Sequence, residues 1–480
     1  MDSHNEQGLQ SNPILEMNAK EFTVDEEISL DETDASTIQY DPRRWAVLCA
    51  FNLVTFSSNL AWLTFAPSAN RFSEYYEMAS HFYVDSLSTV YMLTYPVFLL
   101  PALTVSSYFY KRELSKNGSS LDASEAGSTE KTKSIGYGLR GTLITAILLH
   151  ASGCWLRFLG GKIFPLVWLG QALASLCQVF TLGMPPLLSS VWFKPDEQNI
   201  AISLGVTSNI LGCTVGFLLT PFAVGAVDLD KTIPAYLLYQ AVGYSVLALA
   251  IILLFPTAPR MSQRKPIQID FSKETTLFVL RKLSKTPGFL LLATCYGLLV
   301  GSQYAVQTLL TSIILPVFVD KSEVEIGWLG FWLLISGILA SLICGLYLDY
   351  SKRYISFTLI CYSITILSLL SMNVALEKEA YLIIYISSLV YGMATVSLTP
   401  ALFQYAMVYF NKRDDEAAIT GILNSMAQIV GIVLISSMSA IQADKVSSEP
   451  QFTMRVPAWL LVAVTCLGLP LLLISQKKMS

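Results

Sequence analysis

The sequence predicts an all-α integral membrane protein, with twelve transmembrane helices arranged in two six-helix bundles. Of its 480 residues, 53% are hydrophobic and only 14% are charged, whereas a soluble domain carries roughly 25% charged residues. The charged residues also stand in blocks between long apolar runs. Each helix that crosses a bilayer core of about 30 Å needs about 20 apolar residues. The length of this chain therefore limits the number of membrane-spanning helices rather than the number of globular domains.

Twelve apolar runs can be placed along the chain, and polar segments separate them. The runs lie near residues 45–66, 84–109, 138–159, 163–190, 199–224, 234–255, 288–317, 327–349, 354–375, 380–409, 416–440 and 456–475. The long polar connection after the sixth run divides them into two equal sets. We therefore expect an N-terminal six-helix bundle at 43–255, a basic cytoplasmic linker at 256–287 and a C-terminal six-helix bundle at 288–476.

The remaining polar segments are expected to lie outside the bilayer. Residues 1–42 hold 11 acidic side chains against a single Lys, which predicts a disordered acidic cytoplasmic tail. The insert 111–137 is rich in Ser, Gly, Lys and Glu, so it is too polar to bury and is also expected to be disordered. Residues 477–480 form a short cytoplasmic end. No cleavable signal peptide is recognised before the first run, which is expected to act as its own insertion signal.

The distribution of Lys and Arg predicts the orientation. With the N-terminus in the cytoplasm, the cytoplasmic segments hold 22 of these residues and the outer segments hold 8, as the positive-inside rule requires. Both termini are therefore expected in the cytoplasm. The plasma membrane is the expected location, with an endomembrane of the endoplasmic reticulum, vacuole or lysosome as the alternative.

Polar side chains inside the apolar runs are the first candidates for a substrate pathway, because an unpaired polar group is costly in hydrocarbon. These side chains are Gln178, Asn209, Gln404, Asn424 and Gln428. Asn424 and Gln428 are four residues apart on one helix and therefore share a face. Amide side chains also join neighbouring helices by hydrogen bonds, so a packing role is the alternative for each of them.

Two aromatic residues occupy matching positions in the two halves. Trp62 lies 17 residues into the first run, and Tyr304 lies 16 residues into the seventh. A pseudo-symmetric pair of bundles would bring these side chains to the same depth. If both face the cavity between the halves, they form an aromatic box for a cation. A Trp62 side chain in contact with lipid is the alternative.

No run carries Asp, Glu, Lys or Arg near its centre, so a carboxylate proton relay is not expected. The one titratable side chain at depth is His150. It either shuttles protons or is a neutral histidine that is bonded within the bundle. Because the membrane potential alone supplies about 2.3 kcal/mol per charge per 100 mV, a monovalent cation needs no coupling ion. The sequence therefore predicts facilitated transport.

Small residues predict a close helix contact in the fifth run. Ser208, Gly212 and Gly216 are spaced four apart, and such a ridge of small side chains lets helices approach closely. We expect this ridge where the two halves move against each other. No metal site or cofactor is expected, because the histidines (His4, His81 and His150) are scattered and the chain shows neither a Gly-rich phosphate loop nor a nucleophile elbow. The protein is therefore not expected to be an enzyme.

Two six-helix sets joined by a cytoplasmic loop resemble the major facilitator superfamily, in which substrate sits between the halves. The segment Gly345–Arg353 is similar to the short loop signature of that superfamily. More specific stretches resemble the feline leukaemia virus subgroup C receptor family of haem and choline or ethanolamine transporters. They are DSLSTVYMLTYP at 85–96, GQALASLCQVFTLGMPPLLSSVWF at 170–193, GSQYAVQTLL at 301–310, CGLYLDY at 344–350 and GILNSMAQIVG at 421–431.

This resemblance implies roles for some of the same residues. It implies that Trp62 and Tyr304 form an aromatic choline box and that Gln178 and Gln428 line the same cavity. The chain differs from the family pattern at three positions: Gln404 stands in place of an acidic residue, His150 in place of an Asn, and Ile210 in place of a Gln.

We therefore expect a transporter that moves a small organic cation, such as choline or ethanolamine, by alternating access. We expect it to act as a monomer in the lipid bilayer, without a nucleic-acid partner. Haem and a pyridoxine-type metabolite are the alternative substrates. Haem is disfavoured because no paired His or Cys ligands lie in the runs and only His81, on an outer loop, could bind iron. A receptor without transport activity would need a larger soluble part than the 42-residue tail.

Overall fold

The computed structural model describes residues 40–78, 80–118, 136, 138–225, 228–259, 281–283, 285–351, 353–410, 416–448 and 454–479. Within them, twelve helices are long and apolar enough to cross a membrane, which confirms the predicted number. Most of the acidic tail, residues 119–135 of the insert and most of the basic linker lie outside the described residues.

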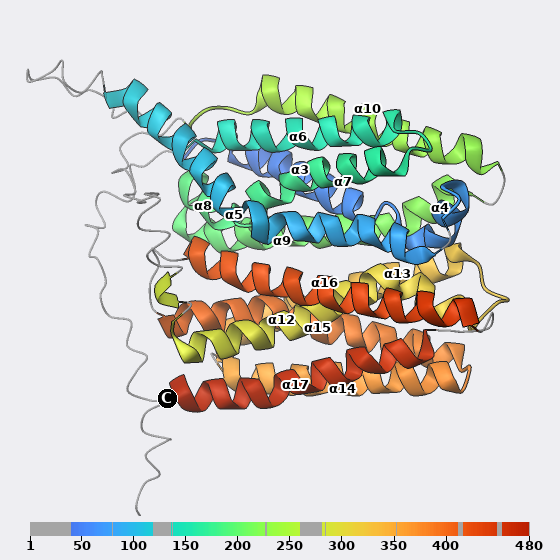
Figure 1. The fold of residues 1–480 in the computed structure, drawn as a ribbon. Helices are drawn as coiled ribbons and strands as arrows, with labels where there is room; N and C mark the ends of the chain where they lie inside the picture. Colours follow the sequence, from blue (N-terminus) through green and yellow to red (C-terminus); the bar gives the residue numbers. More distant parts are fainter. Residues whose placement is uncertain are drawn as a thin grey trace, which may run out of the picture.

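The chain forms two sets of six long helices, which lie one above the other in Figure 1. The long helices of the N-terminal set are α3 (Arg44–Trp62), α5 (His81–Gly118), α6 (Leu139–Leu159), α7 (Phe164–Thr181), α9 (Pro195–Val224) and α10 (Leu229–Leu254). The long helices of the C-terminal set are α12 (Pro287–Ile314), α13 (Glu323–Ser351), α14 (Tyr354–Glu377), α15 (Tyr381–Phe410), α16 (Glu416–Ser448) and α17 (Arg455–Met479). The sets meet where α5 packs on α16 and α9 packs on α13.

Two of the expected runs are interrupted. The first span leaves the α-helix after Trp62 and continues through the 3-10 helix η1 (Ala66–Ser68) into α4 (Ala69–Tyr75). The fourth run divides into α7 and the short helix α8 (Pro185–Trp192). Two prolines occupy the first positions of α8, where their missing N–H groups would have no helical partner in any case.

The predicted disorder of the insert 111–137 is wrong for its first part. Helix α5 continues to Gly118, because residues 111–117 include good helix formers and no Pro or Gly. The carboxylate of Glu113 in this extension accepts hydrogen bonds from the backbone N–H groups of Gly136 (2.5 Å) and Gly138 (2.7 Å). These bonds hold the far end of the insert beside α5.

The small-residue ridge of α9 faces α3 of its own half, not the opposite half as predicted. The Ser208 hydroxyl lies 2.7 Å from the hydroxyl of Thr55 on α3. A Cβ added to Gly212 would stand 2.3 Å from the backbone oxygen of Phe56. The ridge therefore holds α3 and α9 together within one bundle. At the contact between the halves, Gly330 of α13 receives the ring of Phe217 from α9, and Gly327 of α13 faces the backbone oxygen of Phe217.

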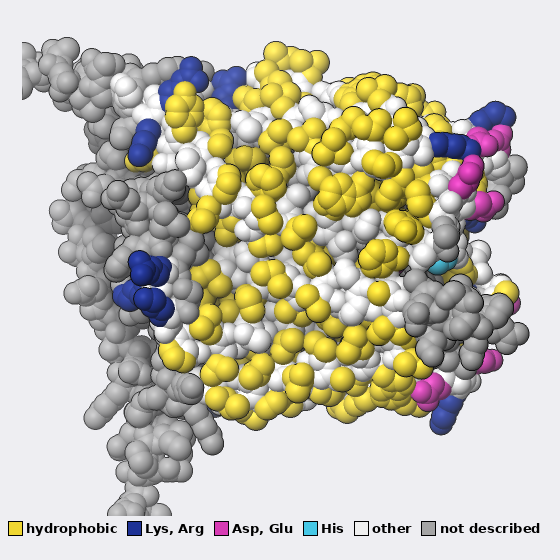
Figure 2. Space-filling view, viewed as in Figure 1, with side chains coloured by type: hydrophobic (Ala, Val, Ile, Leu, Met, Phe, Trp, Pro, Cys, Tyr) yellow, Lys and Arg dark blue, Asp and Glu magenta, His cyan; other side chains and the backbone are white. Residues whose placement is uncertain are grey.

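The outer surface has the composition of a membrane protein. On the face shown in Figure 2, apolar side chains cover a broad middle band. Lys and Arg side chains lie at both ends of this face, whereas the visible Asp and Glu side chains lie at the end to the right. Helix α4 lies at this second end (Figure 1), which we call the α4 end.

The contact at Gly212 predicts the effect of one added methyl group. In Gly212→Ala the Cβ collides with backbone rather than with a movable side chain, so α3 and α9 must separate. We expect a destabilisation of about 1–3 kcal/mol, measured as a lower melting temperature of the purified protein in detergent. Gly243→Ala on α10 is the matched control, since nothing lies within 4 Å of its added Cβ. Equal melting temperatures for both variants would contradict this account of the ridge.

Candidate functional site

The two predicted aromatic residues meet across the two halves of the protein. The ring of Trp62, at the end of α3, contacts the ring of Tyr304, in α12, with a centroid distance of 5.3 Å and an interplanar angle of 80°. Edge-to-face pairs of this kind are worth about 0.5–1.5 kcal/mol beyond the area they bury. Trp62 is 5% exposed, and its indole N–H has no partner among the described residues.

Three of the predicted amides are buried, and they differ in their hydrogen bonds. The side chain of Gln178 donates to the Tyr91 carbonyl of α5. Asn424 is joined by a hydrogen bond to the Tyr95 side chain, and this bond connects α16 with α5 of the other half. Gln428, one helical turn further along α16, is 4% exposed, and its side-chain oxygen has no partner among the described residues.

Gln428 lies one turn before the point where α16 contacts Tyr304. A Cβ added to Gly431, the residue at that point, would stand 3.4 Å from the Cβ of Tyr304 and 2.3 Å from the methyl group of Met92 on α5. The indole N–H of Trp62 and the side-chain oxygen of Gln428 both lack partners in the part of the chain that is described.

Gln404 and His150 have surroundings that differ from those of these amides, although the His150 Nε2 also lacks a partner among the described residues. The Gln404 side chain is exposed on α15, unlike the buried amides of α7 and α16. His150 on α6 is completely buried, with Nδ1 3.1 Å from the Ala174 carbonyl oxygen. Its ring lies against the ring of Tyr244, with 4.6 Å between the centroids.

Contacts that the sequence did not predict join the halves towards the α4 end. Arg71 of α4 forms an ion pair with Glu323 at the start of α13, with 3.1 Å between Nε and Oε2. The Thr311 hydroxyl of α12 donates to the Pro67 carbonyl oxygen at 3.0 Å. All four residues lie at the ends of helices or in short elements, where the hydrophobic pattern of a sequence carries no pairing information.

A buried carboxylate adds a further contact between the halves. The Ser439 hydroxyl of α16 donates to Asp85 of α5 at 2.6 Å, and Asp85 is 2% exposed. Together with the ion pair of Arg71, this bond closes the space between the halves on the α4 side of the aromatic pair.

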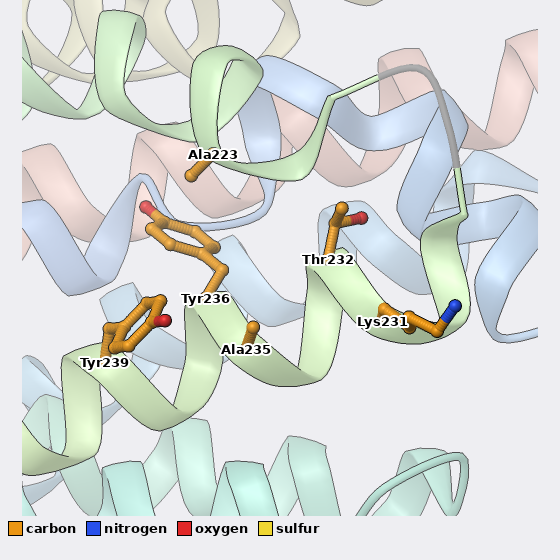
Figure 3. A pocket seen from close by; sticks show the side chains of 6 residues that line it. All are labelled: Ala223, Lys231, Thr232, Ala235, Tyr236 and Tyr239. Atoms are coloured by element: carbon orange, nitrogen blue, oxygen red, sulfur yellow. The ribbon is translucent and has the colours of Figure 1, made fainter.

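A cavity of about 310 Å³ lies apart from these residues. Figure 3 shows it between the end of α9 and the first turns of α10. It is lined by Ala223, Lys231, Thr232, Ala235, Tyr236 and Tyr239. The Lys231 ammonium is already paired with Asp228, and none of the predicted site residues lies in this lining. Among the described residues, no group of three or more His, Cys, Asp or Glu side chains could hold a metal ion.

Comparison with known proteins identifies the family. The model of the Major Facilitator Superfamily matches residues 134–436. The choline/ethanolamine transporter FLVCR2 of Rattus norvegicus is 30% identical over 426 residues, which cover 86% of this chain and 72% of the relative. The corresponding flvcr2b of Danio rerio is 30% identical over 404 residues, covering 82% and 76%. The chain belongs to the feline leukaemia virus subgroup C receptor family of the major facilitator superfamily.

The solved structures agree on the fold. A D-xylose-proton symporter shares it with a TM-score of 0.63 and 11% sequence identity, covering 89% of this chain and 96% of the symporter. The chain is therefore a multi-pass membrane transporter with the major facilitator fold and not an enzyme. The family membership and the twelve-helix fold predicted from the sequence are both confirmed.

The contacts at the α4 end predict how this transporter responds to loss of one charge. Arg71→Ala leaves the buried Glu323 carboxylate without its cation, so the halves should separate more readily at this end. The reporter is Ser312→Cys, next to Thr311 and 4% exposed in the native chain. We expect maleimide to label it at least several-fold faster in detergent when Arg71 is replaced.

The double variant Arg71→Glu with Glu323→Arg restores an ion pair and should return the labelling rate towards that of the reporter alone. The chain without the reporter measures the background from its own cysteines, of which Cys49 is exposed. A labelling rate that does not change in Arg71→Ala would show that the ion pair does not hold this end closed.

Proposed function

We propose that this transporter carries a small organic cation of the choline or ethanolamine class between its two halves. The observation that carries the proposal is the contact of Trp62 with Tyr304, because each half contributes one ring. An ammonium group against such rings gains about 0.5–1 kcal/mol per contact in water and about 2 kcal/mol when desolvated. The names of the relatives from Rattus norvegicus and Danio rerio support the same substrate class.

The hydroxyl of choline matches the polar groups beside the rings. It can donate to the side-chain oxygen of Gln428 and accept from the indole N–H of Trp62, and both groups lack a partner among the described residues. A buried polar group without a partner costs about 1–3 kcal/mol, so a ligand that satisfies both is favoured. Gln178 contributes if its bond to the Tyr91 carbonyl opens, and Asn424 holds the neighbouring turn of α16.

Alternating access is the proposed mechanism. The contacts of Arg71, Thr311 and Asp85 close one end between the halves, and each must break for that end to open. In this proposal the α4 end faces outward. On the face shown, the charged side chains visible at the opposite end are Lys and Arg without Asp or Glu, and the positive-inside rule favours a basic end on the cytoplasmic side. The tails then lie in the cytoplasm, the host is the plasma membrane, and one chain suffices because it holds both rings.

Choline and ethanolamine uptake by proteoliposomes that contain the purified protein tests the substrate class. We expect saturable uptake, with a ratio of maximal rate to KM about tenfold or more lower in Trp62→Ala and Tyr304→Ala, because about 2 kcal/mol of desolvated cation–π attraction is lost. Trp168→Ala is the matched control, since Trp168 is 37% exposed on α7 and should tolerate the change.

The same vesicles are also offered haem and pyridoxine. Uptake of neither choline nor ethanolamine, or choline uptake equal in Trp62→Ala and the native protein, would refute the cation proposal. Haem uptake that competes with choline would assign the site to a broader range of substrates.

Facilitated transport of a cation predicts a driving force set by its own concentration gradient and the membrane potential, without a coupling ion. We expect an inside-negative potential to raise choline uptake and a pH gradient without a potential to leave it unchanged. His150→Asn should keep most of the activity, because an amide can still bond to the Ala174 carbonyl that His150 faces. A proton-coupled current that disappears together with transport in His150→Asn would contradict this mechanism.

A further inference from the structure

The backbone leaves the helix at the residue that carries the proposed site. Helix α3 ends at Trp62, and Leu63, Thr64 and Phe65 form a turn that is completely buried. Backbone that is not helical is tolerated within a membrane span only where protein groups satisfy its polar atoms. The last carbonyl groups of α3 therefore need partners from other helices.

A single arginine organises these partners. Arg157 of α6 is completely buried. Its two terminal nitrogens donate to the side-chain oxygens of Gln171 on α7 and Gln240 on α10, each at 2.8 Å. One of them also lies 3.5 Å from the Ala61 carbonyl oxygen, which accepts a hydrogen bond from the Gln171 side chain at 3.2 Å.

The same network holds the chain on the other side of Trp62. The amide of Gln240 donates to the Thr64 hydroxyl at 3.1 Å, and the Arg157 guanidinium carbon lies 5.8 Å from the centroid of the Phe65 ring. Trp62 is thus bracketed by Ala61 before it and by Thr64 and Phe65 after it. All three neighbours contact Arg157 or a glutamine that Arg157 holds.

The charge of Arg157 has no carboxylate partner among the described residues. Its interactions are with amide oxygens, a backbone carbonyl, the Cys154 sulfur and an aromatic ring. A buried cation without a counter-ion is costly, and the negative end of the α3 dipole at Ala61 partly offsets it. A buried leucine in this place would avoid the free-energy cost of removing a charge from water, so the arginine indicates a role other than packing.

We propose that Arg157 is a positioning residue, which holds the break of α3 through Gln171 and Gln240 so that the Trp62 ring is presented to the substrate. The inference rests on the proposed function, since it assigns a role within that site. A guanidinium suits it because its planar fork reaches both glutamines at once. The ammonium group of a lysine at the same place carries the charge but lacks the planar fork of a guanidinium.

The test compares choline uptake by Arg157→Gln, Arg157→Lys and the native protein in proteoliposomes. A ring displaced by about 1 Å loses about ten- to a hundredfold in binding or rate, so we expect KM for choline to rise at least about tenfold in Arg157→Gln. The maximal rate per folded transporter should change much less. Arg157→Lys should be only partly impaired.

A second substrate distinguishes positioning from general damage. The quaternary ammonium of choline depends on the aromatic rings, whereas the primary ammonium of ethanolamine can also donate hydrogen bonds. We therefore expect Arg157→Gln to raise KM more for choline than for ethanolamine, and we expect the same difference for Trp62→Ala. Arg140→Gln is the matched control, because Arg140 on the same helix donates to the Ile252 carbonyl, far along α6 from this network.

A variant that spares the arginine covers the case in which Arg157→Gln fails to fold. Thr64→Val removes the hydroxyl that Gln240 holds and keeps a similar volume, and it should shift KM in the same direction by a smaller factor. If native protein transports choline and Trp62→Ala does not, but both Arg157→Gln and Thr64→Val keep the native KM, the positioning role is overturned. A reduced maximal rate at an unchanged KM overturns it as well. Absence of choline uptake by the native protein refutes the proposed function instead.

Discussion

The end of α3 at Trp62 is the feature on which the rest of the site depends. A membrane span cannot leave its backbone groups unpaired, because hydrocarbon offers no hydrogen bonds. Here the carbonyl oxygen of Ala61 accepts hydrogen bonds from the Thr64 backbone N–H, the Gln171 side chain and Arg157. Three other helices of the bundle, α6, α7 and α10, therefore fix where the first span bends. The bend in turn places the indole of Trp62 at the boundary between the halves.

The two halves touch through contacts that are individually weak. The contacts on one side of the interface or at its middle are an edge-to-face aromatic pair, one ion pair, two hydrogen bonds donated by hydroxyl groups and the Tyr95–Asn424 bond. Small residues allow backbone-to-backbone packing within a half, as at Gly212, and also between the halves, where a Cβ added to Gly327 of α13 would stand 2.4 Å from the backbone oxygen of Phe217.

The proposed site would suit one positive charge better than two. The aromatic pair offers two rings and an indole N–H that has no partner among the described residues. Recognition would then rest on cation–π attraction and hydrogen bonds rather than on an ion pair. Such a site holds its substrate less tightly than a carboxylate would, which favours release on the other side of the membrane.

Apolar runs and the repeated spacing of Trp62 and Tyr304 determined the number of spans, the two halves and the aromatic pair, because these features depend on local composition and on an internal repeat. The tertiary structure decided the rest. The face to which Gly212 turns, the bond partners of Arg157 and the pairing of Arg71 with Glu323 join residues far apart in the chain. In the sequence, Arg157 stands near the end of its apolar run, where a charged side chain can reach water. Only the packing of α6 against α3, α7 and α10 turns this side chain into the bundle. Hydrophobic periodicity indicates that a residue is buried. The hydrogen-bond partners of a buried polar residue, in contrast, depend on how the helices pack.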